Sequence, residues 1–319
     1  MTAPDPLVSV VIVSYETREL TLIAIRSLLE HTTKHPIEVI VVDNASSDGT
    51  ADAIEAELPE VRLFRLDDNV GFARGVNHGA RQARGRYLML LNPDTVVHDD
   101  VVAELVRFAE AEPDVGLLGG RTLSTEGEYD PGSCWGLPTP FSYLCFGLGL
   151  TAAFKGHPRL DPEALGGWER DTAREVGLVT GCLLLVRTDV WRELDGFDER
   201  FFMYAEDADL AKRAWDLGYR QMITPDATIT HHLGAASKVK SSKRIMVARG
   251  KATYVRKHWS RPAAAFGLSM LVLGHALRAG VHAAVGVVRP GRNDPSWGET
   301  LREVRSWIGG WPPYQGTTG

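Results

Sequence analysis

The sequence predicts an α/β fold: a mixed, mainly parallel sheet flanked by helices, followed by a basic and amphipathic helical extension. Three observations predict it. Short runs rich in β-branched residues alternate with helical segments over the first 120 residues. A composition of 44% hydrophobic and 24% charged residues over 319 positions is typical of a globular protein with a substantial core. From about residue 240 onward the alternation ends and only helical patterns remain.

The alternation begins with a β-branched strand, a helix with one apolar face and a second strand, at residues 7–14, 18–31 and 37–42. This order favours parallel pairing, because the helix returns the chain to the edge of the sheet from which it started. The next elements expected are a helix, a strand, a helix, a buried strand and a helix, at 48–57, 61–65, 72–83, 87–91 and 99–111.

Segment 122–174 is rich in Gly, Pro and aromatic residues and shows no regular period. Irregular segments of this length in compact domains are usually functional or mobile. A Val/Leu-rich strand at 176–186 then restores the alternation, which continues to a histidine pair at 231 and 232.

Two helical patterns occupy the C-terminal part, a basic one at 242–258 and an apolar one at 263–288. Arg278 interrupts the apolar helix, so no uncharged run reaches the ~20 residues of a membrane-spanning helix. His275, Arg278 and His282 form one polar stripe on it, and Arg261, Arg289 and Arg292 flank it. This pattern suits a helix that lies in a membrane interface. The alternative is an amphipathic helix packed on its own domain.

The net charge of −6 hides a strong asymmetry. Between residues 227 and 293 there are twelve Lys or Arg and no Asp or Glu, which leaves the rest of the chain at −18. A basic block on an acidic body indicates an anionic partner, with a solvated basic face as the alternative. We expect an anionic membrane surface and no nucleic acid, because no nucleic-acid-binding motif is present and the neighbouring helix is apolar.

The cysteines and the chain start predict a cytoplasmic protein. Cys134, Cys145 and Cys182 have no CxxC spacing, and we expect free thiols in a reducing compartment. The first residues lack a basic n-region, and their apolar run is too short for a signal peptide.

An acidic cluster, Glu206-Asp207-Ala208-Asp209, opens a predicted helix. The N-terminal dipole should help to keep such acids ionised, and an ionised carboxylate can act as a general base. Downstream, an imidazole of the histidine pair can bind a metal if the chain folds back toward the acids. The alternative is helix capping together with ion pairs to Lys212 or Arg213.

Three further motifs could bind a ligand at strand ends, and each could instead be a simple turn. Asp43, at the end of the second strand, could accept hydrogen bonds from a base imide or a ribose. Asp94, after the buried strand, could hold Mg²⁺ or Mn²⁺ and through it a diphosphate. In segment 69–77, glycines, a helix start and Arg74 suit an anion.

Together these motifs resemble the family-2 glycosyltransferases of the GT-A (Rossmann-like) fold, an inverting family that uses nucleotide-sugar donors. The resemblance covers about residues 7–260. It rests on VSVVIVSYE, VVDNASSDGT, NVGFARGVN, LLNPD, GFDERFFMYAEDADL and the histidine pair, which occur in the family's order.

The resemblance implies a role for each of these positions. Asp207 matches the family's catalytic base, with Glu206 as the second choice. Asp94 matches the last acid of the metal-binding DXD motif and His231 a metal-binding histidine, whereas His232 is the weaker match. Asn92 replaces the first acid of DXD, which leaves fewer charged ligands for Mg²⁺ or Mn²⁺. The predicted nucleotide-sugar-binding residues are Tyr15, Glu16, Asp43, Asn44, Asn69, Gly71, Arg74, Asn77 and Asn92.

The sub-pattern with NPD and FDERFFMYAEDADL looks most like rhamnosyltransferases that take dTDP-rhamnose and act on polyprenyl-diphosphate-linked sugars in cell-envelope glycan synthesis. It implies a glycosyltransferase domain over residues 1–240, with a nucleotide-binding half at 1–120 and an acceptor half at 121–240. Residues 241–319 would form a membrane-associating extension that makes the protein peripheral at the inner face of the plasma membrane.

Three alternatives remain open. One is a UDP-sugar-dependent galactofuranosyl or N-acetylglucosaminyl transferase. Another is a non-catalytic nucleotide-sugar-binding component of a polysaccharide assembly complex, a reading favoured by Asn92. The third is a nucleotidyltransferase, but the glycine-rich phosphate loop expected after its first strand is missing, since Ser14-Tyr15-Glu16 stands there.

Overall fold

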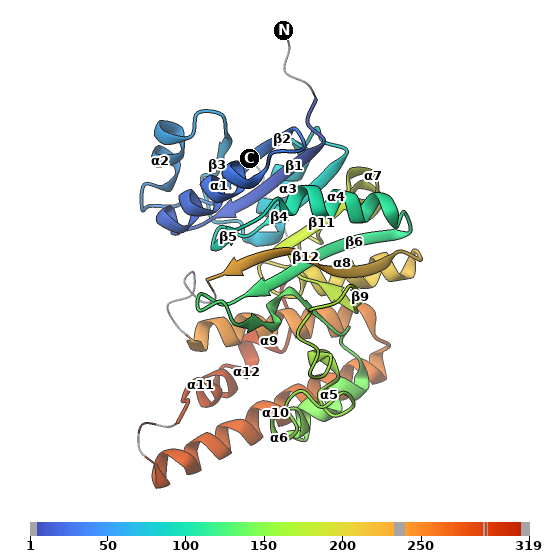
Figure 1. The fold of residues 1–319 in the computed structure, drawn as a ribbon. Coiled ribbons are helices and arrows are strands. Elements are labelled where there is room, and N and C mark those ends of the chain that lie inside the picture. Colours follow the sequence, from blue (N-terminus) through green and yellow to red (C-terminus); the bar gives the residue numbers. More distant parts are fainter. Residues whose placement is uncertain (1–4, 233–239, 290, 292, 314–319) are drawn as a thin grey trace. The chain divides into compact units, whose positions relative to one another are not determined.

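A computed structural model describes residues 5–232, 240–289, 291 and 293–313. The chain divides into two compact units (Figure 1). The first comprises residues 1–135, 169–198 and 207–236, and the second comprises 136–168, 199–206 and 237–319. The second unit therefore includes 136–168 and 199–206, two segments that the sequence analysis assigned to the glycosyltransferase domain.

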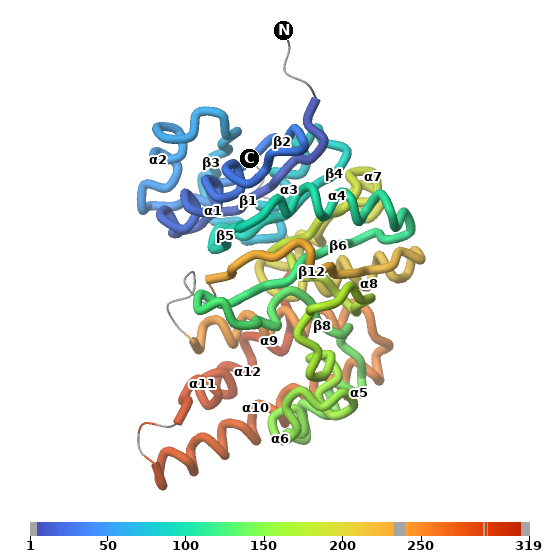
Figure 2. Tube along the Cα trace, in the orientation of Figure 1, coloured from blue at the N-terminus to red at the C-terminus, as the bar shows by residue number. Residues whose placement is uncertain are grey.

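Within the described residues, the first unit contains a ten-stranded mixed sheet with the central order β3-β2-β1-β4-β11-β6-β12-β5. Parallel pairs join β1 to β2 and β4, β2 to β3, and β6 to β12, which Figure 2 lets the reader follow along the chain. Strand β11 is antiparallel to both β4 and β6. The predicted mixed sheet is confirmed. Its strands are β1 (Val8–Ser14), β2 (Ile37–Asp43), β3 (Arg62–Arg65), β4 (Tyr87–Leu91), β5 (Thr95–Val97), β6 (Val115–Leu123), β11 (Leu183–Arg187) and β12 (Arg220–His231).

The helices of this unit are α1 (Arg18–His31), α2 (Thr50–Glu57), α3 (Phe72–Arg81), α4 (Val101–Ala111), α7 (Thr188–Glu193) and α8 (Glu206–Asp216). Ile12, Met89 and Leu185, from three neighbouring strands, share a core with Ile25 of α1 and Leu105 of α4. None of these five side chains is more than 1% exposed. Burial of this apolar face holds the sheet and its helices together.

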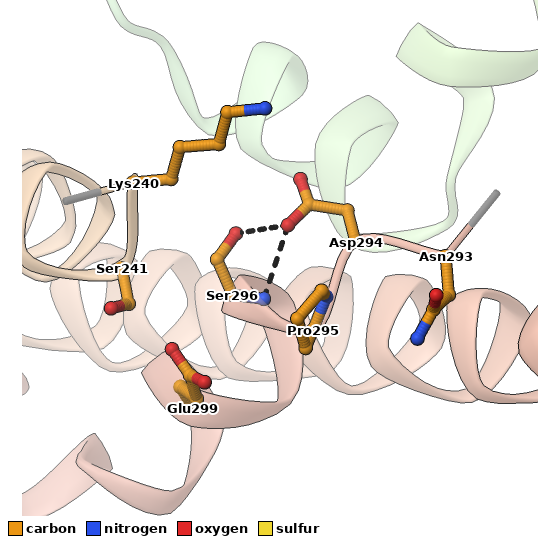
Figure 3. A pocket seen from close by; sticks show the side chains of 7 residues that line it. All are labelled: Lys240, Ser241, Asn293, Asp294, Pro295, Ser296 and Glu299. Atoms are coloured by element: carbon orange, nitrogen blue, oxygen red, sulfur yellow. Dashed lines mark hydrogen bonds between the residues drawn. The ribbon is translucent and has the colours of Figure 1, made fainter. Parts of the chain in front are cut away.

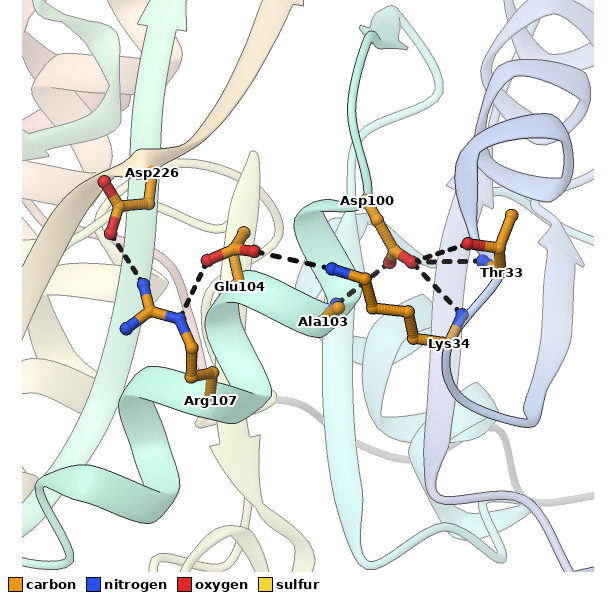
Figure 4. Close-up of polar contacts among 7 residues, drawn as sticks. All are labelled: Thr33, Lys34, Asp100, Ala103, Glu104, Arg107 and Asp226. Carbon is orange, nitrogen blue, oxygen red and sulfur yellow. Dashed lines mark hydrogen bonds and ion pairs between the residues drawn. The ribbon is translucent and has the colours of Figure 1, made fainter.

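Helix α4 is anchored by polar contacts at both ends, as Figure 4 shows. Asp100 caps it by accepting from the Ala103 N–H at 3.0 Å, and its other oxygen accepts from the backbone of the turn that follows α1. Further along the helix, Arg107 pairs with Asp226 of β12 at 2.7 Å. These contacts fix α4 against both α1 and β12.

The structure corrects two predictions about secondary structure. The single strand predicted at 176–186 is two strands, β10 (Leu178–Val179) and β11, separated by Thr180–Cys182. The chain breaks there because Thr180 donates its N–H to the Ser133 carbonyl at 3.0 Å. The irregular segment 122–174 contains a helix, α5 (Pro140–Gly147), whose start is fixed by a capping box between Thr139 and Ser142.

Short elements complete both units. They are β7 (Tyr129–Asp130), β8 (Cys134–Trp135) and β9 (Arg174–Glu175) in the first unit, and α6 (Leu150–Ala153) in the second. The second unit otherwise consists of α5, α9 (Lys240–His258), α10 (Arg261–Val288), α11 (Ser296–Arg302) and α12 (Val304–Trp307). Cys134, Cys145 and Cys182 are buried free thiols, as predicted.

The polar stripe of α10 faces the interior of the second unit. His275 is 4% exposed and packs against Phe146, Trp297 and Trp307. Burial lowers the pKa of His275 to about 4. Arg278 donates to the Phe146 carbonyl at 2.9 Å and to the Thr151 hydroxyl at 2.8 Å. The stripe therefore binds neighbouring helices and does not face a headgroup layer.

Part of the basic block is also neutralised inside this unit. Arg244 pairs with Asp294 at 3.0 Å, and Lys251 pairs with Glu163 at 3.1 Å. Arg292, one of the predicted flanking residues, lies outside the described residues.

The side of α10 opposite the stripe is apolar and exposed. Phe266, Leu277, Val281 and Val288 lie within about 60° of one another at 100° per residue. Their exposed fractions are 39%, 42%, 61% and 76%. By length and composition alone, α10 could cross a membrane, and 17% of its most apolar stretch is buried.

Candidate functional site

The carboxyl ends of β1, β2 and β4 lie at one edge of the sheet, where open α/β sheets bind their ligands. Ser14, the last residue of β1, pairs with Asp43, the last residue of β2. Strand β4 runs parallel on the other side of β1, so Asn92 follows at the same edge. All of the predicted site residues except Glu206 belong to the first unit.

Asp43 is 3% exposed and has one carboxylate oxygen to spare. Its Oδ2 accepts from the Ser46 N–H at 3.2 Å, which closes the turn after β2. Its Oδ1 is buried and has no hydrogen-bond partner among the described residues. A cleft of about 370 Å³ opens beside it, lined by parts of segments 43–52 and 65–67. A buried oxygen without a partner at such a cleft is suited to accept from a ligand N–H or O–H.

Tyr15 and Glu16 follow β1 and behave differently. Tyr15 is 46% exposed. Glu16 turns back with a positive φ of 54°. Its Oε1 accepts from the N–H and hydroxyl of Ser47, at 2.6 and 2.9 Å. Glu16 therefore braces the loop after β2, whereas Tyr15 is free to face a ligand.

Asn44 and Asn69 shape the loop before α3. The Asn44 amide donates to Asn69 Oδ1 at 2.9 Å and accepts from the Val70 N–H, also at 2.9 Å. Gly71 has a φ of 87°, a left-handed conformation that glycine adopts without strain. Arg74, one turn into α3, is half-buried and lies near the Val70 carbonyl. The two asparagines thus position this helix start.

Asn77 joins α3 to the segment that precedes α8. Its amide nitrogen donates to the Phe197 carbonyl at 2.8 Å, and its amide oxygen accepts from the Phe197 N–H at 3.0 Å. The side chain is 7% exposed. This arrangement commits Asn77 to positioning the backbone at Phe197.

Asp94 and His231 come together although 137 positions separate them. Strand β12 pairs with β5 so that His231 lies opposite Thr95. The Asp94 carbonyl accepts from the His232 N–H at 2.8 Å. The Asp94 Oδ1 and His231 Nε2 atoms are 3.2 Å apart, and both side chains are about 10% exposed or less. His231 Nδ1 is buried without a hydrogen-bond partner among the described residues.

Asp94 and His231 are suited to bind a divalent cation whose remaining ligands are water or phosphate. Two ligands of one octahedral cation, each at about 2.0–2.1 Å, lie about 3 Å apart when they are adjacent. Among the described residues, no group of three or more His, Cys, Asp or Glu side chains is placed to hold a metal. A cation here would keep several water or phosphate ligands, as Mg²⁺ does at phosphate-binding sites. Asn92 lies in the turn between β4 and Asp94 and is half-buried.

Asp207, the second residue of α8, carries the strongest electrostatic signature of the site. Burial raises the pKa of its carboxyl from 3.8 to about 6, and the neighbouring backbone N–H groups lower the pKa only in part. The helix dipole was expected to favour the ionised carboxylate, but loss of hydration on burial favours the neutral carboxyl and is the larger effect. One predicted ion pair forms within the acidic cluster, because Arg213 pairs with Asp209, whereas Lys212 pairs with Asp216 outside the cluster. Asp207 is thus a candidate base that is mostly ionised at neutral pH.

The turn before α8 is held by close packing. Tyr204 and Ala205 have positive φ angles of 69° and 73°. Glu206 follows, begins α8 and is 6% exposed. Gly250 of α9 lies against this turn, and a Cβ there would be 2.2 Å from the Tyr204 carbonyl oxygen. The absence of a side chain at Gly250 therefore lets the turn that precedes α8 pack closely against α9.

Asp130 is a candidate that the sequence analysis missed. It is 4% exposed, its Oδ1 accepts from the Gly132 N–H at 3.2 Å, and its Oδ2 is buried without a partner among the described residues. In the sequence, Asp130-Pro131-Gly132 looks like an ordinary turn.

A pocket of about 310 Å³ in the second unit contains none of the predicted site residues (Figure 3). Lys240 and Ser241 come from the start of α9, and Asn293, Asp294 and Glu299 come from the segment that contains the start of α11. Asp294 Oδ1 accepts from both the N–H and the hydroxyl of Ser296, which caps the start of α11. Asp294 also pairs with Arg244, so its carboxylate is engaged in local contacts.

Comparison with known sequences agrees with the motifs. Residues 9–152 match the family described as Glycosyl transferase family 2. An N-acetylglucosaminyl-diphospho-decaprenol L-rhamnosyltransferase of Mycobacterium tuberculosis is 29% identical over 249 residues, covering 71% of this chain and 76% of that protein. An O-antigen biosynthesis protein of Myxococcus xanthus is 29% identical over 241 residues, covering 73% of this chain and 18% of that protein.

Solved structures share the fold. A mannosyltransferase from Pyrobaculum calidifontis, in complex with GDP-Man and Mn²⁺, has a TM-score of 0.57 at 21% identity, covering 96% of this chain and 89% of that one. A fragment of S. aureus TarS in complex with UDP-GlcNAc has a TM-score of 0.52 at 18% identity, covering 94% and 81%. The chain shares the GT-A fold with these structures, and at such identities the likeness concerns the fold alone.

Proposed function

We propose that the chain is a family-2 glycosyltransferase that moves a sugar from a nucleoside-diphosphate donor to a hydroxyl of a lipid-linked or polysaccharide acceptor, with inversion. The family match over residues 9–152 and the shared GT-A fold support this proposal. The observation that carries this proposal is the pairing of Asp94 with His231 at the sheet edge that also holds Asp43. L-Rhamnose from dTDP-rhamnose is the donor we favour, supported by the M. tuberculosis relative.

The nucleotide would lie over the ends of β1 and β2. Asp43 Oδ1 is placed to accept a hydrogen bond from the base or ribose, and Tyr15 offers an exposed ring for the base to stack on. Arg74, near the start of α3, would face the diphosphate. Asn44, Asn69, Gly71 and Glu16 hold the two loops in this shape.

Asp207 would accept the proton of the acceptor hydroxyl as that hydroxyl attacks the anomeric carbon. One displacement needs one base and no covalent intermediate, so the anomeric configuration inverts. A raised pKa near 6 makes a carboxylate a better base than one near 4, while leaving it mostly ionised at neutral pH. Glu206 remains the second choice. A divalent cation held by Asp94 and His231 would supply positive charge beside the leaving diphosphate.

The acceptor proposal includes an anionic membrane surface. The relative's name specifies a decaprenol-linked sugar, and a lipid-linked acceptor must be met at a membrane. The exposed side of α10 is apolar, whereas its other side packs on α5 and α11 through Arg278 and His275. Because one side of α10 is covered by other helices of its unit, α10 would lie along the membrane–water interface and not cross the membrane. Exposed Arg261 and Arg289 at its ends would attract anionic headgroups.

Donor turnover tests the proposed activity. Purified protein with Mn²⁺ would be incubated with dTDP-rhamnose, UDP-GlcNAc, UDP-galactofuranose and GDP-mannose, and release of the nucleoside diphosphate measured with and without a polyprenyl-diphosphate-linked GlcNAc acceptor. We expect acceptor-dependent release from dTDP-rhamnose. Release from a UDP-sugar instead would move the donor assignment to the galactofuranosyl or N-acetylglucosaminyl alternative. Donor binding without release from any sugar would favour the non-catalytic alternative.

Vesicle binding tests the membrane proposal separately. Val281→Glu places a charge on the apolar side of α10, and Leu217→Glu places one at a similarly exposed apolar position in the first unit. With vesicles that contain phosphatidylglycerol, we expect Val281→Glu to weaken binding by at least about tenfold and Leu217→Glu to change it little. Equal binding by both variants would contradict the proposal.

A further inference from the structure

Asp130 lies next to the turn that carries Asn92 and Asp94. Thr180 connects them: its hydroxyl donates to the Gly132 carbonyl at 2.8 Å and contacts the Cys182 sulfur at 3.0 Å. The Cys182 backbone carbonyl in turn accepts from the Asn92 N–H at 3.1 Å. Burial raises the pKa of the Cys182 thiol to about 12, and the carboxylates of Asp130 and Asp94 both add to this increase. Both carboxylates therefore lie close enough to act on one buried thiol.

The local structure uses only part of the Asp130 side chain. Capping the turn at Pro131–Ser133 requires one oxygen, Oδ1, which accepts from Gly132. Oδ2 is buried and has no hydrogen-bond partner among the described residues. An Asn or Ser could cap this turn equally well without a buried charge. Removing a carboxylate from water is costly, so a purely capping role does not account for an acid here.

Asn92 stands where the metal motif of related enzymes has its first acid, so the turn itself carries one carboxylate, Asp94. We propose that Asp130 is a positioning residue for the cation: it supplies from β7 the negative charge that Asn92 does not. This inference rests on the proposed metal role of Asp94 and His231. No contact between Asp130 and the cation is implied, in agreement with the absence of a group of three metal-binding side chains among the described residues.

The physical reason is that charges act over longer distances inside a protein than in water. At an effective dielectric constant near 20, an anion several ångströms from a cation site still raises the affinity for the cation by a measurable factor. Two neighbouring carboxylates also repel each other, and a cation relieves this repulsion. Asp130 would thus increase affinity for Mn²⁺ without a direct bond.

The test measures Mn²⁺ binding to the full chain in the absence of nucleotide and acceptor, by electron paramagnetic resonance of free Mn²⁺. We expect Asp130→Asn to weaken Mn²⁺ binding about tenfold, which corresponds to about 1.4 kcal/mol. Asp216→Asn, which removes an exposed acid of α8, serves as the matched control and should change the affinity little. Asp130→Ser provides a second variant that keeps a cap for Gly132 if the Asn variant folds poorly.

A charge-relocation variant makes the test specific. Asn92→Asp combined with Asp130→Asn restores the acid on the turn itself, and we expect it to recover wild-type Mn²⁺ affinity or exceed it. Unchanged Mn²⁺ affinity in folded Asp130→Asn, or no recovery in the double variant, would overturn the proposal. Absence of Mn²⁺ binding to the wild type would also overturn it, while donor transfer that persists in EDTA would show that the glycosyltransferase function stands without the metal.

Discussion

Replacing Asp207 by Asn removes the proposed base while keeping the size of the side chain. General-base catalysis typically contributes about 10²–10⁴-fold to the rate, so we expect transfer to fall by that factor. Binding of the nucleoside diphosphate should change little, because Asp43 and the loops that surround it do not depend on α8. Asp216→Asn, at the exposed far end of the same helix, is the control.

The pH dependence gives this prediction a second, independent readout. With a pKa of about 6, Asp207 is about 90% ionised at pH 7 and about 10% ionised at pH 5. Because the ionised form is the active one, kcat/KM should fall toward tenfold per pH unit below about pH 6. The assay is release of nucleoside diphosphate from the donor at saturating acceptor, over pH 5–8. A flat profile down to pH 5, or transfer retained by Asp207→Asn, would refute the assignment of the base.

Ionisation of the Asp207 carboxyl should lower the free energy of unfolding. Its pKa is raised in the folded state, so the ionised form is disfavoured there, and the cost appears as pH rises from about 4 through 6. The shift corresponds to roughly 3 kcal/mol, and partial exposure reduces it to about 1–2 kcal/mol. Asp207→Asn should therefore unfold at a higher denaturant concentration than the wild type at pH 8 and at a similar one at pH 4. A variant less stable than the wild type at pH 8 would contradict this account.

Three further predictions concern residues around the site and in the second unit. Asn77→Ala removes both hydrogen bonds to Phe197 and should destabilise the protein by about 1–3 kcal/mol. It should also lower kcat more than it raises the donor KM. A change in KM alone would argue against a positioning role. Gly250→Ala places a Cβ against the Tyr204 carbonyl and should lower kcat while nucleotide affinity stays the same, whereas unchanged kcat would show that the turn does not position Asp207. The pKa of His275 is about 4 in the folded state against 6.5 when unfolded, so the protein should lose up to roughly 3 kcal/mol of unfolding free energy as the pH falls through this range. Denaturation followed by tryptophan fluorescence should show this pH dependence in the wild type and a weaker one in His275→Phe.

Much of the fold was predictable from local pattern. The helix at 18–31 and the strand at 87–91 were predicted with the bounds that the structure has, because an apolar period indicates the buried face of a helix and a short continuous apolar run indicates a buried strand. The break at Thr180–Cys182 was not predictable, since it depends on hydrogen bonds to Ser133 and Asn92, which are distant in sequence. Hydrogen bonds between residues distant in sequence cannot be recognised from the hydropathy pattern.

The candidate site was predictable to a similar extent. The family resemblance implied that Asp94 and His231 serve one metal, and β12 and β5 bring the two side chains to 3.2 Å from each other. The direction of the pKa shift at Asp207 could not be predicted, because it depends on burial. The spacing of polar residues predicted the polar stripe of α10. That spacing does not show whether Arg278 contacts water, lipid headgroups or a protein carbonyl such as that of Phe146.

The anomeric configuration of the product tests the central claim most directly. Product made from whichever of the dTDP-, UDP- and GDP-sugars the protein turns over would be characterised by proton NMR at the new glycosidic bond. A single displacement with Asp207 as the base predicts a configuration opposite to that of the donor. Retention of the donor's configuration, or no transfer from any of these sugars in the presence of Mn²⁺, would contradict the account.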